Sequence, residues 1–279
     1  MINIVVALPA EARPLLDHFR LRDKQHNTAF PIYRNTDMAL IVSGPGKVAA
    51  AAATALLAGT GTPHTRAAWL NIGIAGHAHH AIGSGYIAHR ITDSATGKSW
   101  YPPQIHELST PTENLYTVDR PEDNYPAAAL YEMEASGFFP VACRFSSSEL
   151  VQCFKVISDN RTQGTTAVTA KLCVQLIAER LADIEQLINT LSGMADEYAT
   201  WHAPHPDLEQ LSTRWRFSVS QQHQLAELAR RWKVLTADQP LWLEQLEKTR
   251  SARAVLHCLE QHLETLSTSS PSTCSVPSI

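Results

Sequence analysis

The chain has 279 residues, of which 44% are hydrophobic, and it carries a formal net charge of −4 with an isoelectric point near 6.3. This length suffices for one large domain with a smaller addition, and the acidic balance does not favour nucleic acid as a partner. The first apolar run, residues 2–10, follows no basic segment, and no stretch approaches the roughly 18–20 apolar residues that span a bilayer. We therefore expect no signal peptide and no contact with a membrane.

The cysteines are odd in number and form no CxxC pair. Most of them lie among apolar neighbours, where a small buried thiol is the simplest interpretation. We therefore expect a reducing compartment, the cytoplasm. The five positions are Cys143, Cys153, Cys173, Cys258 and Cys274.

The first 165 residues alternate predicted strands with predicted helices. Apolar runs typical of buried strands are separated by two segments with helical spacing, residues 11–19 and 48–57, and most strands end in a Gly- or Asp-bearing turn. This alternation predicts an α/β fold, with its ligand site at the carboxyl ends of the strands. The expected strands are residues 2–8, 38–42, 69–74, 86–93 and 152–157.

Beyond about residue 165 the pattern becomes helical. Apolar residues recur at spacings of three and four between Ile177 and Leu191, again between Leu225 and Trp232, and between Leu241 and Leu266. The final residues are rich in Ser, Thr and Pro, which indicates disorder. We expect an α/β domain over residues 1–194, a helical accessory segment over 195–266 and a disordered tail over 267–279.

Five short segments occur in a characteristic order. In this order and at these spacings they resemble the purine nucleoside phosphorylase/nucleosidase superfamily, most closely its 5′-methylthioadenosine/S-adenosylhomocysteine nucleosidase branch. The resemblance covers about residues 1–193. The segments are IVVALPAE (4–11), SGPGKVAA (43–50), NIGIAG (71–76), EMEA (132–135) and KVISD (155–159).

The resemblance implies a three-layer nucleoside phosphorylase-like fold, with a central mixed sheet flanked by helices and a C-terminal all-helical extension. It implies cleavage of the N-glycosidic bond of a purine nucleoside, with a 5′-modified adenine nucleoside as the first substrate to consider. It also implies a homo-oligomer that needs no metal and no other cofactor.

Asp159 is the candidate acid. Cleavage of a ribosyl C–N bond passes through an oxocarbenium-like transition state, and the departing base needs a proton. The resemblance assigns protonation of the purine N7 to Asp159. An Asp after a strand could equally cap the next helix, and Ser158 could orient Asp159 or satisfy backbone groups.

Glu134 and Met133 are the candidate ribose site. A carboxylate can accept hydrogen bonds from both ribose hydroxyls, and the resemblance implies this role for Glu134, with Met133 packed beneath the sugar. The alternative is a glutamate at a helix start beside a core methionine. Glu132 is expected to face solvent. Gly44, Gly46 and Gly73 are expected to let the backbone approach the ligand.

The nucleophile side departs from the family pattern. Phosphorylases carry Arg at the position of Asn71 and Ser or Thr at Ile74, so Ile74 argues against phosphate binding. Nucleosidases place Glu at Ala12 and Arg at Lys155. Glu11 lies one residue before the position of the family's Glu and, in an alignment without a gap, would point elsewhere. We still assign Glu11 and Lys155 to the side of the attacking nucleophile.

Three functions remain open on these residues: a nucleosidase, a phosphate-dependent phosphorylase, and a nucleoside-binding protein of the same fold without turnover. Hydrolysis is favoured because Ile74 offers phosphate no donor.

Two further features have more than one interpretation. His77, His79 and His80 could bind a metal, but a solvated loop fits their spacing better. Tyr125, in the loop before Glu134, could stack on a base or pack on its own loop.

Overall fold

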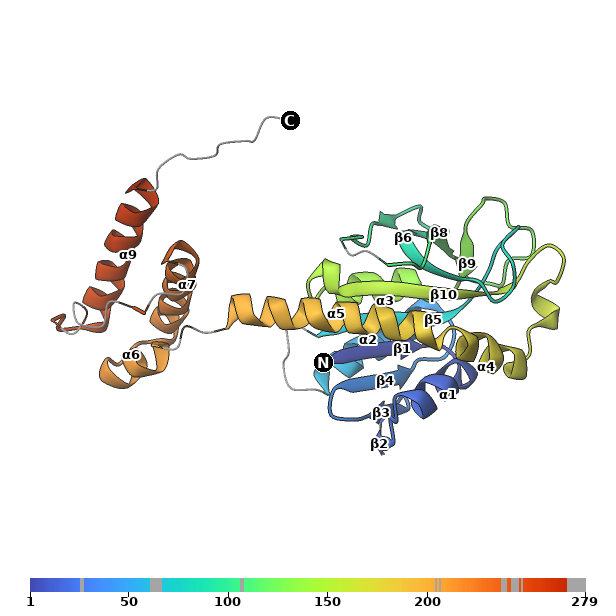
Figure 1. Cartoon of the computed structure of the whole chain (residues 1–279), viewed down its shortest axis with the longest axis horizontal. Helices are drawn as coiled ribbons and strands as arrows, with labels where there is room; N and C mark the ends of the chain where they lie inside the picture. Colours follow the sequence, from blue (N-terminus) through green and yellow to red (C-terminus); the bar gives the residue numbers. More distant parts are fainter. Residues whose placement is uncertain are drawn as a thin grey trace. The chain divides into compact units, whose positions relative to one another are not determined.

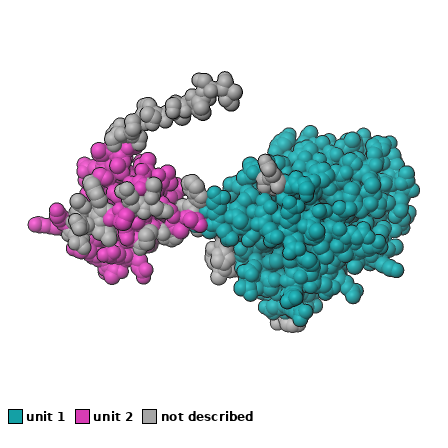
Figure 2. Space-filling view, in the orientation of Figure 1, with its two compact units in different colours: residues 1–199 teal, residues 200–279 magenta. Residues whose placement is uncertain are grey.

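The computed structural model describes residues 1–25, 28–60, 67–105, 108–203, 205, 207–236, 240–241, 246 and 248–269. The chain divides into two compact units, residues 1–199 and 200–279 (Figure 2). The boundary expected after residue 194 lies inside helix α5 (Leu181–His202). The expected tail begins inside helix α9 (Ala252–Ser269), and its residues 270–279 lie outside the described residues.

The first unit is built on one mixed sheet. The apolar runs form its central strands, while several shorter strands carry no clear alternation that would have predicted them. The strands are β1 (Ile2–Val6), β2 (Asp23–Gln25), β3 (Ile32–Arg34), β4 (Met38–Val42), β5 (Ala68–Gly76), β6 (Gly85–Asp93), β7 (Ser99–Trp100), β8 (Thr112–Thr117), β9 (Leu130–Glu132) and β10 (Val151–Asp159).

Part of this sheet closes on itself. Strand β5 pairs with β9, β9 with β8, β8 with β6, β6 with β10, and β10 again with β5. From this ring the sheet extends through β1, β4, β3 and β2, with β1 parallel to both β4 and β5 (Figure 1). Strands β1, β4, β5 and β10 are therefore parallel, and their carboxyl ends meet on one side.

Local sequence features explain where the helices begin. Pro9 occupies the first turn of α1, where its missing N–H is not needed. Gly46, with φ of 101°, precedes α2, and the hydroxyl of Thr169 caps α4 by accepting from the Leu172 N–H. The helices of this unit are α1 (Pro9–His18), α2 (Lys47–Gly59), α3 (Ala135–Ala142), α4 (Ala170–Glu179) and α5.

Two hydrophobic cores lie on the two faces of the sheet. Alternate residues of a strand point to opposite faces, so Ile4 and Val6 join one core while Val5 joins the other. The first core includes residues of α1, α4 and α5, and the second includes residues of α2 and α3 (Figure 1). The unit is thus the expected three-layer nucleoside phosphorylase-like fold, with a mixed sheet between helices.

The second unit is helical and has a hydrophobic core of its own. Its helices are α6 (Leu208–Arg214), α7 (Val219–Thr236) and α9, and the stripe predicted between Leu225 and Trp232 is buried on α7. Its core includes Trp215, Phe217 and Leu259. The C-terminal helices predicted from the sequence are therefore present. In both units, no helix among the described residues is long and apolar enough to cross a membrane.

The contact between α2 and α3 yields a prediction. A Cβ on Gly137 would lie 1.9 Å from the backbone oxygen of Lys47, which cannot move independently of α2. Gly137→Ala should therefore lower the free energy of unfolding by about 2–3 kcal/mol, the range of an overpacked core. Gly193 lies in the exposed interior of α5 with no atom within 4 Å of such a Cβ, so Gly193→Ala should gain up to about 1 kcal/mol. Urea unfolding of both variants checks this; equal effects would contradict it.

Candidate active site

A cavity of about 230 Å³ opens where the strands of the first unit end. Its wall combines residues at the ends of β1, β5, β9 and β10 with residues of the loops that follow β4 and β8. This is the place expected for the ligand site of such a sheet. The lining residues are Ala7, Leu8, Glu11, Pro45, Ile74, Ala75, Gly76, Val118, Pro121, Glu122, Tyr131, Glu132, Met133, Glu134, Ser158, Asp159, Thr165 and Val168.

Asp159 ends β10 and lines the cavity, with 5% of its surface exposed. Its Oδ2 accepts a hydrogen bond from the Tyr125 hydroxyl at 2.5 Å, and its Oδ1 accepts one from the Ser158 hydroxyl. The strand pairing shifts register between Ile157 and Asp159, which turns the end of β10. Two hydroxyl donors thus hold the Asp159 carboxyl at the cavity wall.

Glu134 precedes α3 and also lines the cavity. Its Oε1 accepts a hydrogen bond from the Gly46 N–H at 2.8 Å, so the glycine turn before α2 holds this side chain. Burial, and then the neighbouring charge of Glu132, raise the pKa of Glu134 to about 7, while Lys155 and the Gly46 N–H oppose the shift. Its Oε2 accepts from the Met133 N–H at 3.4 Å, and the remaining lone-pair positions can accept from hydroxyl groups in the cavity.

Glu11 faces the cavity although it was one residue out of the expected register. Its Oε2 accepts from the N–H groups of Ala7 and Leu8, and its Oε1 accepts from that of Ile74 at 2.9 Å. Burial raises the pKa of Glu11, against the Lys155 charge and these three donors. A carboxylate has about four lone-pair positions, so one remains for a further donor such as water.

The expectation that Glu11 would point elsewhere was therefore wrong. Ala12, which the ungapped register placed on the nucleophile side, is buried in the core with Leu15. The reason is local: Glu11 occupies the first turn of α1, where its carboxylate turns back onto the N–H of Leu8.

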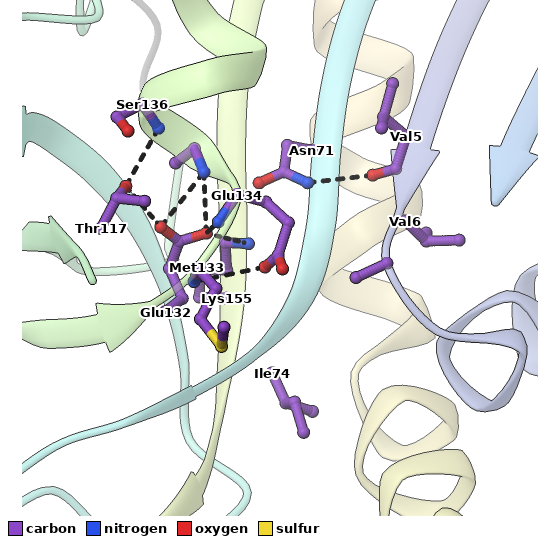
Figure 3. Close-up of polar contacts among 12 residues, drawn as sticks. Val5, Val6, Asn71, Ile74, Thr117, Glu132, Met133, Glu134, Ser136 and Lys155 are labelled. Atoms are coloured by element: carbon purple, nitrogen blue, oxygen red, sulfur yellow. Dashed lines mark hydrogen bonds and ion pairs between the residues drawn. The ribbon is translucent and has the colours of Figure 1, made fainter. Parts of the chain in front are cut away.

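Lys155 and Glu132 form a buried ion pair, in which Glu132 belongs to the cavity wall and Lys155 lies behind it. The Lys155 Nζ lies 2.9 Å from the Glu132 Oε2, and both side chains are 1% exposed. Glu132 also accepts from the Thr117 hydroxyl and from the N–H groups of Glu134 and Ala135 (Figure 3). The prediction that Glu132 faces solvent was wrong, because Lys155 and these donors compensate its burial.

The charge of Lys155 interacts with several carboxylates. Burial alone would lower the pKa of Lys155, but the charges of Glu132 and Glu134 outweigh it and raise that pKa. A Cβ on Gly73 would lie 2.7 Å from the Glu11 Oε1 and 3.5 Å from the Lys155 Nζ. Glu11 and Lys155 therefore both lie beside the β5 backbone at Gly73, and the charge of Glu11 also acts on Lys155.

The remaining predicted residues differ in their relation to the cavity. Ile74, Met133 and Ser158 line it, whereas Lys155, Gly44, Gly46 and Gly73 support it from outside. Ile74 offers no polar side-chain atom (Figure 3). Asn71 turns away from the cavity and donates to the Val5 carbonyl. Glu122, Tyr131 and Thr165 line the cavity and were not predicted, since no motif marks them.

The described cavity wall is acidic and contains no basic side chain. Carboxylates come from Glu11, Glu122, Glu132, Glu134 and Asp159, while Lys, Arg and His are absent from the described lining. Lys47, the cation of the glycine turn, is ion-paired with Asp93 and Asp119. An anionic ligand would find charge repulsion here and no charge-assisted donor.

The segment of His77, His79 and His80 is a loop, as expected, and His79 is exposed, but His77 is buried. His77 is 2% exposed, its Nδ1 accepts from the N–H groups of His79 and His80, and its ring stacks on that of His80. Possible metal-ligand atoms of His77, His80 and Glu113 lie within 4.8 Å of one another. The arrangement suits a metal poorly, because the Nδ1 bonds keep the proton on Nε2 and stacked rings cannot both aim a lone pair at one ion.

Comparisons with known proteins identify the class of fold. A scan of protein-family models finds no match to this sequence, and a comparison with curated proteins finds none either. Solved structures do match this fold, among them 5′-methylthioadenosine/S-adenosylhomocysteine nucleosidases. The first unit has the fold of these enzymes.

Three of these structures illustrate the likeness. An MTA/SAH nucleosidase superposes with a TM-score of 0.58 at 18% identity, covering 69% of this chain and 96% of the other. The Helicobacter pylori enzyme, solved with butyl-thio-DADMe-Immucillin-A, gives 0.55 at 13% identity, with 68% and 97% covered. The Arabidopsis thaliana 5′-methylthioadenosine nucleosidase gives 0.54 at 17%, with 69% and 96% covered. The likeness thus confirms the fold that the five sequence segments predicted.

The buried ion pair yields a second prediction. Lys155→Met leaves Glu132 buried without its cation and should lower the free energy of unfolding by about 3–5 kcal/mol. Lys155→Met combined with Glu132→Gln should recover part of this loss, because the amide has no charge and its oxygen can still accept from Thr117 and Ala135, although its NH2 cannot accept from the Glu134 N–H. Lys171→Met, an exposed position of α4, is the control and should change stability by about 0.5 kcal/mol or less. Chemical denaturation measures all three; a Lys155→Met loss no larger than the control would contradict the assignment.

His77 yields a third prediction, on acid stability. Burial, and then the neighbouring His80, lower the pKa of His77 to about 4 from 6.5, so the unfolded chain takes up a proton first. The contribution of His77 to the free energy of unfolding is complete above pH 6.5. About 1–3 kcal/mol is lost as the pH falls to about 4. His77→Asn keeps an acceptor for the same N–H groups and does not titrate. Its thermal unfolding should lose less stability than the wild type between pH 7 and pH 4; parallel curves would disprove this.

Proposed function

We propose that the protein is a nucleosidase that hydrolyses the N-glycosidic bond of a purine nucleoside, with a 5′-modified adenine nucleoside as the first candidate. One observation carries the proposal: Asp159, Glu134 and Glu11 converge on one cavity whose described lining has no basic side chain. Three carboxylates around a small cavity are what protonation of a base, binding of a ribose and activation of water require.

Each carboxylate has one proposed task. Water attacks C1′ of the ribose while the bond from C1′ to the base nitrogen breaks and its electron pair goes to the base. Asp159 gives its proton to N7 of the purine, and Glu11 takes the proton of the attacking water at its remaining lone-pair position. Glu134 accepts hydrogen bonds from the ribose hydroxyls, and Met133 packs beneath the sugar.

The acidic lining supports hydrolysis over phosphorolysis. A phosphate dianion needs charge-assisted donors, but Lys155 is paired with Glu132 and Lys47 with Asp93 and Asp119. The side chain of Ile74 provides no donor. Water, which is neutral, is the nucleophile that this wall accepts.

The apolar part of the lining supports an uncharged 5′-substituent. Leu8, Pro45 and Val168 contribute apolar surface to the same cavity. Inhibitors with alkylthio groups occupy solved nucleosidases of this fold, as the butyl-thio compound in the Helicobacter pylori enzyme illustrates. Methylthioadenosine and 5′-deoxyadenosine are therefore the first substrates to test.

A nucleoside-binding protein without turnover is the second candidate. Both Asp159 oxygens accept hydroxyl donors, and three backbone donors occupy Glu11, so both groups are less free than an acid and a base need to be. Nucleoside binding without release of base over hours would favour this candidate.

We also place the protein in a reducing compartment, the cytoplasm. The described cysteines Cys143, Cys153, Cys173 and Cys258 are free thiols. Burial raises the pKa of Cys173 to about 12 and that of Cys143 to about 11, so these thiols stay protonated and unreactive.

The fourth prediction tests the nucleosidase. Chromatography should detect free base from a panel of 5′-substituted adenosines, inosine and guanosine, at equal rates with and without phosphate. Asp159→Asn and Glu11→Gln should each lower kcat about 10²–10⁴-fold, the range for loss of an acid or base. Glu185→Gln, which removes a carboxylate paired with His18 outside the cavity, serves as the control. Phosphate-dependent release would establish a phosphorylase instead, and full activity of Asp159→Asn would remove that residue from the mechanism.

A further inference from the structure

Tyr125 is buried although it lies in the loop between β8 and β9. Only 1% of its surface is exposed, and its ring packs with Ala78, Ala129 and Tyr131. The rings of Tyr125 and Tyr131 meet edge to face, with centroids 5.8 Å apart. The Tyr125 ring is therefore part of a small core beside the cavity and does not project into solvent, where it could move freely.

The hydroxyl of Tyr125 is directed at the proposed acid. It donates to the Asp159 Oδ2 at 2.5 Å, while the Ser158 hydroxyl donates to Oδ1. Burial, and then this bond, raise the pKa of Tyr125, so its phenol keeps its proton and remains the donor. Each Asp159 oxygen thus has one fixed hydroxyl donor and further lone-pair positions toward the cavity.

Gly76 completes this packing. A Cβ at Gly76 would meet the Asp159 Oδ2 and would lie 2.8 Å from the Tyr125 Cε1. Only glycine lets the carboxyl and the phenol approach the β5 backbone together. The Asp159 carboxyl is therefore confined between β5 and Tyr125.

The backbone at Tyr125 is held in a conformation that a bulky residue avoids. Its φ is 44°, in the left-handed region. Arg161 donates to the carbonyl oxygens of Asn124 and Tyr125 at 3.5 and 3.4 Å, and the Thr165 N–H donates to Asp123 at 3.2 Å. The segment after Asp159 thus holds the loop that carries Tyr125 in this conformation. Backbone strain of this kind concentrates at functional sites.

We propose that Tyr125 is a positioning residue for the nucleosidase reaction: its hydroxyl fixes the Asp159 carboxyl against Gly76 and, with Ser158, aims the remaining oxygen positions at the base. This inference rests on the proposed function, because it assumes that Asp159 protonates a base. No motif of the sequence marks Tyr125 for this task. It comes from the contact between the β8–β9 loop and the end of β10.

The proposal predicts a split between kcat and KM in Tyr125→Phe. The value of kcat falls about 10-fold or more, the equivalent of one lost hydrogen bond to a carboxyl group. The value of KM stays within about 3-fold of the wild type, because Tyr125 is not among the described residues that line the cavity and acts on the ligand only through Asp159. A merely structural role would raise KM as well, because Tyr131 of the same small core lines the cavity.

Tyr116→Phe is the matched control. Tyr116 packs on Tyr131 next to the same small core but does not line the cavity, and its ring lies 5.7 Å from that of Tyr131. Its kcat and KM should both stay close to the wild-type values. A kcat that falls equally in both variants, or in neither, overturns the proposal.

A measurement without turnover separates this proposal from the proposed function. If the wild type releases no base from any nucleoside, the proposed hydrolysis fails, and calorimetric titration with adenine, hypoxanthine and guanine decides the role of Tyr125. Tyr125→Phe should weaken the binding of a base about 10-fold, whereas Tyr116→Phe should leave it unchanged. Equal affinities of the wild type and Tyr125→Phe, or no binding of any of the three bases, overturn the positioning role.

Discussion

The buried cation of Lys155 offsets the cost of burying several carboxylates in the candidate site. Lys155 lies 2.9 Å from Glu132 in the interior of the first unit, and the charges of Glu132, Glu134 and Glu11 all act on it. Buried carboxylates without a cation would be expected to take up protons or to leave the interior. Lys155 balances the charge of Glu132, while Glu11 and Glu134, whose pKa values are raised by burial, face the same cavity.

The closed ring of strands brings these groups to one place. Strand β10 pairs with β5 along most of its length and supplies both Lys155 and Asp159, four residues apart. Alternation alone would point both side chains to the same face, but the register shift before Asp159 changes the direction of the strand end. Lys155 therefore supports the wall from behind, and Asp159 forms part of it.

The charge of the wall is the basis of the ligand that we propose for it. Five carboxylates and no basic side chain in the described lining give a phosphate no charge-assisted donor, whereas ribose hydroxyls can donate hydrogen bonds to carboxylates. The solved nucleosidases cover 68–69% of the chain, a share that corresponds in size to the first unit. The second unit has a hydrophobic core of its own around Trp215, Phe217 and Leu259.

The sequence alone predicted the main strands of the sheet and most of the carboxylates of the candidate site. Continuous apolar runs predicted β1, β4, β5, β6 and β10, because strands buried on both faces leave that pattern. The order of the five short segments predicted the fold, and Asp159, Glu134 and Glu11 all line the cavity. The short strands β8 and β9 were not predicted, since they are held by closure of the ring and not by their own periodicity.

The tertiary structure alone decided which polar groups are buried and what compensates them. Glu132 looked like a solvated residue because its partner Lys155 is 23 positions away in sequence and 2.9 Å away in space. Tyr125 looked like a loop residue without a fixed partner because its contact with Asp159 joins the β8–β9 loop to the end of β10, which no local pattern connects. Local sequence determines apolar spacing and turn chemistry, whereas the burial of a charge depends on a partner that only the folded chain brings within reach.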